Sequence, residues 1–480
     1  MKKMLVALIA LSVLSTNAFS QTLEERVADL EMTRDLSWIK WSGSLETRYD
    51  HVERERKKDY TDLNSTTFRP QDQTKGSDSD NYYRLWANLN MHANPTDRLS
   101  FFGRLSAAKY FSVLGSNGQP STSFADLGDG QLPNRSILFL ERAFANYKIT
   151  NDLVFTMGRL PTIDGPNKHI ALNQQLAGNY PTLAYSAILD GFALSHSLKL
   201  DGNAAFRTKL IFTPLQTVNY MGGESLADAR GNEVETSSDM FSLLMEYEKN
   251  GGSFYRKNLT IFQWVHGENT PFYVNSTSLA PAGPGPAPVA TVNVNSDLNV
   301  SVDRLVLYSE FEQIFHSDFD LAAQVMYSHT RSRGDLVNCT DNAGGAVCTG
   351  GGIGSGVQGW NTGKRSDDLD GLASVVTLRY QTPFTFMNRP KVGVEWYQAS
   401  KKAYVYDAAN VNPINMYGTS GGDVYHLFWN QAFDGGLYMN VGYMYRQQKD
   451  MNEAFSGLVG QELKVNNIDQ NIYVSLLATF

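Results

Sequence analysis

The chain of 480 residues lacks an excess of basic charge, since 41 Lys and Arg stand against 49 Asp and Glu. A nucleic-acid-binding domain usually carries a strongly basic surface, so the composition argues against a nucleic-acid partner. Beyond the first twenty residues there is no apolar run of eighteen residues. This absence excludes helical membrane spans, although it leaves residence in a membrane open.

Signatures of metals, cofactors and catalytic nucleophiles are also missing. The eight histidines are scattered singly, without H-E-x-x-H and without an acidic cluster at metal-binding spacing. Residues 354–359 fit G-x-G-x-x-G and residues 418–422 fit G-x-S-x-G, but neither has the strand and helix context that these motifs need. We therefore expect no metal, no cofactor and no enzymatic activity.

The first twenty residues have the pattern of a cleaved Sec signal peptide. Lys2 and Lys3 precede an apolar run over residues 4–14, and Ala18 and Ser20 suit cleavage before residue 21. Cleavage before residue 19 is the alternative. The apolar run is too short to cross a hydrocarbon layer of about 30 Å as a helix. The mature chain is therefore predicted to be exported through the inner membrane.

Residues 21–37 predict one short amphipathic helix in the periplasm. Leu23, Val27 and Leu30 recur at helical spacing, and Thr22 and Glu25 are placed as a capping box. About one heptad is present, whereas a self-associating coil usually needs three or four. A solvated N-terminal stub is the other interpretation.

The chain has only two cysteines, Cys339 and Cys348, in a polar, glycine-rich segment. An exported protein enters an oxidising compartment, which favours a local disulfide between them. A zinc site would need two more ligands nearby, and the nearest histidine, His329, falls on a predicted strand. We expect a disulfide that closes a loop.

From Trp38 onward apolar and polar residues alternate, which is typical of β-strands with two unlike faces. Two sets of side chains alternate in the first segment: Ile39, Trp41, Gly43, Leu45, Thr47 and Tyr49 against Lys40, Ser42, Ser44, Glu46, Arg48 and Asp50. Further strands are predicted at residues 82–92, 98–111, 137–149, 153–159, 187–198, 203–213, 236–248, 256–267, 298–312, 319–331, 370–381, 391–401, 423–433, 437–448 and 465–480. The total is about sixteen, with fourteen to eighteen allowed because several segments alternate imperfectly.

The connections between these segments alternate in length. Short turns such as residues 150–152 and 434–436 alternate with long polar stretches such as residues 53–80 and 275–296. Short turns on one side and long loops on the other are typical of bacterial outer-membrane barrels. Several soluble sandwich domains, the alternative, would not produce this regular rhythm. Residues 38–480 are therefore predicted to form one all-β, transmembrane, antiparallel up-and-down barrel.

The last strand alternates up to a C-terminal Phe. Ile472, Val474, Leu476 and Ala478 lead to Phe480, and this ending resembles the C-terminal signature of Gram-negative outer-membrane barrels. Over residues 38–480 the pattern is similar to that of sixteen-stranded porins. The resemblance implies insertion among outer-membrane lipid and lipopolysaccharide, and recognition of the last strand by the barrel-assembly machinery. Related porins form trimers, and the residues leave monomer and homotrimer open.

A barrel of this size leaves an aqueous channel, so the expected function is passive diffusion of small hydrophilic solutes or ions. In general porins the third long loop narrows the lumen, and residues 160–186 occupy that place here. This stretch is partly apolar, unlike the other loops, so we expect it to pack inside the barrel as a constriction. It offers Asp164, Lys168 and His169 to the pore.

Porins that resemble this chain carry a ladder of arginines opposite that loop. Arg48, Arg84, Arg104 and Arg142 fall on the polar faces of the first four strands, with Glu46 beside them. Guanidinium groups stay charged, and rows of them favour anions in a pore. The alternative is that these residues form ion pairs along a wet lumen. A single bulge would also invert the faces.

Two other functions remain open at this stage. A barrel hydrolase would need polar residues of separate strands to converge, for example Ser328 or Ser332 with His329. A surface adhesin or receptor would use the long loops, including the Pro-rich residues 279–288 and the segment that holds the two cysteines. Either can equally be a solvated spacer.

Overall fold

The computed structural model describes residues 38–57, 76–111, 138–174, 176, 178–200, 203–214, 239–272, 298–333, 337–342, 345–350, 369–403, 405, 412–414, 416–417, 421–450 and 464–480. The predicted signal peptide (1–20) and amphipathic helix (21–37) lie outside these residues and stay predictions. Among the described residues, no helix is long and apolar enough to cross a membrane.

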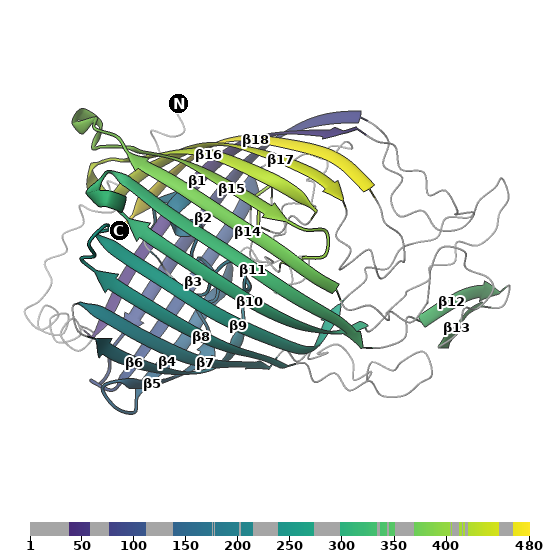
Figure 1. Cartoon of the computed structure of the whole chain (residues 1–480), viewed down its shortest axis with the longest axis horizontal. Helices are drawn as coiled ribbons and strands as arrows, with labels where there is room; N and C mark the ends of the chain where they lie inside the picture. Colours follow the sequence, from purple (N-terminus) through teal and green to yellow (C-terminus); the bar gives the residue numbers. More distant parts are fainter. Residues whose placement is uncertain are drawn as a thin grey trace, which may run out of the picture.

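Sixteen antiparallel strands form a closed barrel in which β1 pairs with β18 to complete the ring (Figure 1). The strands of the barrel are β1 (Ile39–Arg56), β2 (Gly76–Ala93), β3 (Leu99–Phe111), β4 (Leu138–Lys148), β5 (Leu153–Arg159), β6 (Asp190–Leu200), β7 (Ala204–Pro214), β8 (Asp239–Asn250), β9 (Lys257–Phe272), β10 (Leu298–Glu312), β11 (Phe319–Arg333), β14 (Leu369–Gln381), β15 (Lys391–Ala399), β16 (Gly422–Ala432), β17 (Leu437–Asp450) and β18 (Lys464–Thr479). The predicted fold class and strand number are confirmed, and every predicted segment coincides with one strand.

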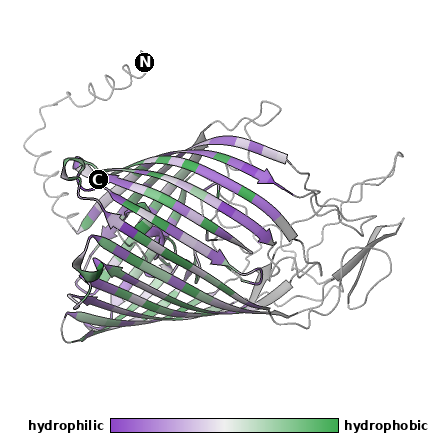
Figure 2. Ribbon diagram, turned by 45° about the horizontal axis from the view of Figure 1, so that its top comes forward, coloured by the Kyte–Doolittle hydropathy of each residue, from purple (hydrophilic) through white to green (hydrophobic). Residues whose placement is uncertain are grey.

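The two faces of each strand differ as the alternation predicts. In β18 the outward side chains Ile472 and Leu476 are 51% and 44% exposed, whereas the inward Tyr473 and Ser475 are buried. Figure 2 shows hydrophobic and hydrophilic residues alternating along the strands. Because a closed ring leaves no unpaired strand edge, its backbone groups are satisfied without water. The barrel therefore presents an apolar surface outside and encloses a lumen.

The ring closes at its C-terminal residue. Phe480 and Gly43 exchange two backbone hydrogen bonds, Gly43 N to Phe480 O at 2.9 Å and Phe480 N to Gly43 O at 3.0 Å. A Cβ atom on Gly43 would lie 2.3 Å from the Phe480 ring and 2.7 Å from the carbonyl oxygen of Asn88. Position 43 consequently admits only glycine while the terminal ring lies over the β1 backbone.

Between β11 and β14, two short strands form a separate hairpin, β12 (Val337–Asn342) and β13 (Gly345–Gly350). It lies beyond the end of the barrel opposite the C terminus (Figure 1). Sequence reasoning treated this stretch as an irregular loop. The register sets Cys339 directly opposite Cys348, a backbone arrangement that suits a disulfide. The cysteine side chains lie outside the described part, so the bond itself stays a prediction.

Candidate functional site: a partly filled lumen

Residues 160–189, called the inward segment, connect β5 to β6 and cross the inside of the barrel. Near β4, Asp164 Oδ2 accepts a hydrogen bond from Arg142 at 2.8 Å. At the other wall, Arg379 of β14 donates to the carbonyl oxygen of Ile170 at 3.1 Å. β4 and β14 lie opposite each other in the ring. The segment, including its short helix α3 (Lys168–Leu172), therefore spans the lumen from wall to wall.

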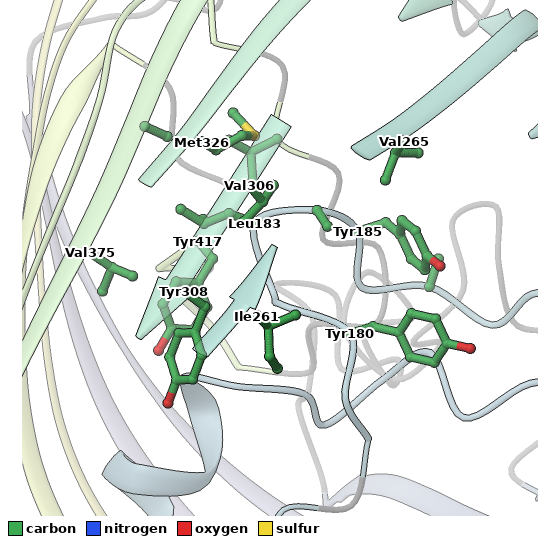
Figure 3. Close-up of a cluster of buried hydrophobic side chains, with 14 of the residues drawn as sticks. Tyr180, Leu183, Tyr185, Ile261, Val265, Val306, Tyr308, Met326, Val375 and Tyr417 are labelled. Atoms are coloured by element: carbon green, nitrogen blue, oxygen red, sulfur yellow. The ribbon is translucent and has the colours of Figure 1, made fainter. Parts of the chain in front are cut away.

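Apolar packing explains why this segment lies inside. Leu160, Ile170, Leu183 and Tyr185 are all buried in one hydrophobic cluster. A fully buried side chain of this size contributes roughly 1.5–3 kcal/mol. The cluster continues into the inward faces of β8 to β16, as Figure 3 shows for the residues that it labels. The inward partners include Leu244, Ile261, Val265, Val306, Tyr308, Met326, Val375, Tyr397 and Val424.

This packing corrects the simple picture of a barrel with a uniformly polar, water-filled lumen. Along β8 to β16 many inward side chains are apolar as well as the outward ones, because they pack against the inward segment instead of water. Buried polar side chains such as Gln263, Gln324 and Glu395 lie among them. In β9, for example, the inward Ile261 and the outward Phe262 are both apolar. Such strands look imperfectly alternating in sequence. Along β1 to β3, β17 and β18 the described inward residues form a largely polar wall that the inward segment does not cover.

A cavity of about 460 Å³, called the lumen cavity, lies on that polar side. Strands β1, β2 and β3 contribute Glu46, Arg84 and Arg104 to one wall. Asp164 and Lys168 of the inward segment contribute to the facing wall. The volume falls within the roughly 300–1,000 Å³ typical of small-molecule sites. The cavity thus brings together residues from the barrel wall and from the segment that narrows it.

The first two predicted arginines face the lumen and contact carboxylates. Arg48 donates to Asp50 at 2.7 Å, and its guanidinium lies 3.8 Å from the centroid of the Tyr473 ring. Arg84 donates to Glu46 at 3.1 Å. Bidentate or stacked guanidinium groups of this kind are held in one orientation. Arg48 and Arg84 thus lie on the inward faces as predicted. Each forms an ion pair, as in the alternative interpretation of the arginines.

The other two arginines share two acids across a β-bulge. The pairing of β3 with β4 shifts after Arg104, so that Arg104 faces Arg142 and Glu141 is the extra residue. Glu141 and Arg142, although adjacent, are both buried on the inward side. Arg104 donates to Glu141 at 2.9 Å and to Asp164 at 3.0 Å. From sequence, any bulge would invert the faces that follow it; here Arg142 still faces inward and the bulge adds the acid Glu141 beside it.

Asp164 lies in the connection, outside the strands. Partial burial opposes ionisation of its carboxyl group, but the positive charges of Arg142 and Arg104 outweigh that effect. The pKa of Asp164 is therefore held below its usual value. Its side chain, still 44% exposed, is charged at neutral pH and fastens the inward segment to β3 and β4.

Lys168 and His169 have different surroundings. Lys168 lines the lumen cavity and donates to Ser186 Oγ at 3.2 Å. His169 Nε2 lies 3.1 Å from Glu310 Oε2 of β10, at the apolar side of the lumen. His169 is not among the residues that line the described cavity. It therefore anchors the inward segment, whereas Lys168 belongs to the cavity wall.

A second connection, residues 400–421 between β15 and β16, also reaches the lumen and was missed by sequence reasoning. Asn412 accepts a hydrogen bond from Arg84 at 3.0 Å and lines the lumen cavity. Tyr417 donates to Glu395 at 2.8 Å and packs in the apolar cluster. The signal was available, since Ile414, Met416 and Tyr417 make this loop partly apolar, as in the inward segment.

The hydrolase alternative lacks its converging residues. Ser328 is buried on the inward face of β11, whereas His329 contacts the exposed Asp370 on the outward face at 2.8 Å. Ser328 and His329 therefore point to opposite sides, and the side chain of Ser332 lies outside the described part. Among the described residues, no group of three or more His, Cys, Asp or Glu could hold a metal ion.

The family described as protein of unknown function (DUF3373) matches residues 77–471, which is most of the barrel. The chain belongs to the DUF3373 family. No curated protein matches it.

Several solved barrels are distantly similar to this DUF3373 protein. A loop-deletion mutant of OmpT, an outer membrane protein of Vibrio cholerae, is 11% identical with a TM-score of 0.46, covering 92% of this chain and 99% of its own. OprB of Pseudomonas putida is 10% identical with a TM-score of 0.46, covering 94% and 97%. An anion-selective porin from Comamonas acidovorans is 9% identical with a TM-score of 0.46, covering 92% and 99%. At this distance the function has to be inferred from the geometry of this lumen.

Proposed function

We propose that the protein is a porin in the outer membrane of a Gram-negative bacterium, where it forms a water-filled passage for passive diffusion of small hydrophilic solutes or ions. Two features support an outer-membrane location. The outward side chains form an apolar surface, and the closed ring leaves no strand edge to lipid. The alternation of outward and inward residues suits lipid outside and water inside.

The observation that carries the proposal is the lumen cavity with its largely polar wall, which lies beside the part of the lumen that the inward segment fills. The inward segment narrows the barrel to this one side, so solutes would pass between β1 to β3 and the segment. A sixteen-stranded barrel with an empty lumen would conduct through a wide pore. A partly filled lumen instead predicts a small, steady conductance.

Planar-bilayer recording of the purified, refolded barrel tests the proposal. Stepwise current increases of uniform size are expected as single barrels insert. The control is the same preparation after heating has removed its β-sheet circular dichroism. Absence of any conductance from a folded sample would contradict the porin proposal and favour the adhesin or hydrolase hypothesis. Sedimentation of cell membranes on a sucrose gradient should place the protein in the outer-membrane fraction.

A further inference from the structure

The arginines of the lumen cavity contact carboxylates directly instead of facing them across the opening. The guanidinium groups of Arg48, Arg84 and Arg104 each lie within 3.1 Å of a carboxylate oxygen. Opposite charges in contact largely cancel at the distance of a passing solute, especially where water and salt screen them. The arginine side of the wall is therefore rich in charged residues and weak in net field, and Lys168 of the inward segment, which donates to Ser186, adds one positive charge to the cavity.

The remaining polar wall consists of amides and hydroxyls. On β1 and β2, Ser44, Asn88 and Asn90 line the cavity, and Asn173 and Gln174 face them from the inward segment. An amide offers both hydrogen-bond donors and acceptors. A solute hydroxyl also acts as both donor and acceptor, so it can replace water at such a wall. A solute with several hydroxyls can exchange its hydration step by step along it.

One aromatic ring on this wall is fixed in place. The indole Nε1 of Trp86 donates to Asn88 Oδ1 at 2.7 Å, and the ring also packs edge-on against Phe139. Trp86 lines the cavity together with Tyr438 of β17. An aromatic face offers apolar contact beside polar groups. A sugar ring has the matching surface, because its C–H groups lie on one face and its hydroxyls at the edge.

We infer that this passage favours uncharged, hydroxyl-rich solutes of hexose size over ions built on the same skeleton. The inference rests on the proposed porin function and names its solute class. An arginine ladder without such pairing, one of the two arrangements that the sequence left open, would favour anions. The direct ion pairs weaken that preference, while the amides and Trp86 supply contacts that need no solute charge.

The test uses three solutes with nearly the same skeleton: glucose, gluconate and glucosamine. The full-length mature protein is reconstituted into liposomes, and the uptake of each radiolabelled solute is measured. The potassium chloride conductance of the same preparation is recorded in parallel. Glucose is expected to enter several-fold faster than either charged relative. Glucose added during single-channel recording should also produce brief current interruptions.

Two pairs of variants separate the wall from the rest of the barrel. Glu46→Gln removes the carboxylate beside Arg84 and should raise the uptake of gluconate relative to that of glucose. Its control is Glu53→Gln, which changes an exposed acid on the same strand and should leave the uptake of both solutes unchanged. Trp86→Ala should shorten the glucose-induced interruptions several-fold, whereas Trp264→Ala on the outward face should leave them unchanged. A β-sheet spectrum and insertion steps establish that each variant is folded.

The outcomes distinguish this inference from the porin proposal. Gluconate or glucosamine entering the wild type as fast as glucose would overturn the inference while the porin proposal stands. Potassium chloride conductance with glucose excluded would do the same. Glucose preference that Trp86→Ala and Glu46→Gln leave unaltered would also overturn it, since the named wall would then not be responsible. Absence of both conductance and uptake would overturn the proposed function itself.

Discussion

Asp164 Oδ2 of the inward segment lies 2.8 Å from a guanidinium nitrogen of Arg142 on β4. This ion pair joins the segment to the barrel wall at the edge of the lumen cavity. The same carboxylate accepts a bond from Arg104 of β3 at 3.0 Å. The Asp164 carboxylate thus offsets part of the positive charge of both arginines. It also holds one end of the segment that narrows the lumen. Charge compensation and loop position depend on the same contact.

Replacing Asp164 with Asn should loosen this end of the inward segment. The variant removes the ionic contacts to Arg104 and Arg142 but keeps the size of the side chain. Because the apolar cluster still anchors the remainder of the segment, the barrel should fold and conduct. We expect several-fold greater open-channel noise and a shift toward anion permeability in bilayer recordings. Asp152→Asn, in a short turn outside the lumen, is the control and should behave like the wild type.

The response of the segment to acid should follow the lowered pKa of Asp164. A carboxyl group whose pKa is lower in the folded state stabilises that state above its usual pKa, and the contribution is lost as pH falls through the lowered value. The quiet conducting state should therefore persist from neutral pH to below 3.8, the usual value for Asp. Recordings across this range test the expectation. Noise that already rises between pH 6 and pH 5 would contradict it.

Leu183→Ala should destabilise the barrel, since Leu183 is completely buried where the inward segment meets β8 to β16. Truncating a buried Leu costs about 2–5 kcal/mol through lost transfer energy and the cavity left behind. The free energy of unfolding in urea with lipid present measures this. Leu372→Ala, on the outward face and 58% exposed, should cost clearly less. Equal losses for the two variants would contradict a packed lumen.

The β12–β13 hairpin should carry a disulfide between Cys339 and Cys348. The exported protein should show no free thiol under denaturing conditions, and two after reduction. Because the hairpin is a sheet separate from the barrel, reduction should leave conductance unchanged. Two reactive thiols in unreduced protein isolated from the cell envelope would contradict the pairing.

Deleting Phe480 should impair closure of the ring. The deletion removes both backbone hydrogen bonds to Gly43, whereas Phe480→Ala keeps them and removes only the ring. Comparing the folded fraction of the two variants on unheated gels separates backbone pairing from recognition of the aromatic side chain. If the assembly machinery reads the ring, both variants should assemble poorly in cells, and Phe480→Ala should still fold in detergent. Normal assembly of both in cells would contradict that role.

The amino-acid sequence by itself determined the class of fold, the sixteen strands and their inside and outside faces. These properties are local, because a period of two residues and the turn residues that interrupt it can be read within each segment. Leu176 and Leu183 likewise marked residues 160–186 as a stretch suited to packing. The imperfect alternation of several segments was readable too, although its cause was not.

Only the tertiary structure decided how charge and water are distributed in the lumen. The partners of Arg84 and Arg104 come from neighbouring strands and from a loop, so they depend on register and on the bulge at Glu141. The apolar side chains on the inward faces of the strands and those of the inward segment bury each other, so neither set can be explained without the other. The inward segment therefore fills one side of the lumen and leaves a cavity on the other. Contacts between residues far apart in the sequence determine which inward side chains are exposed to water.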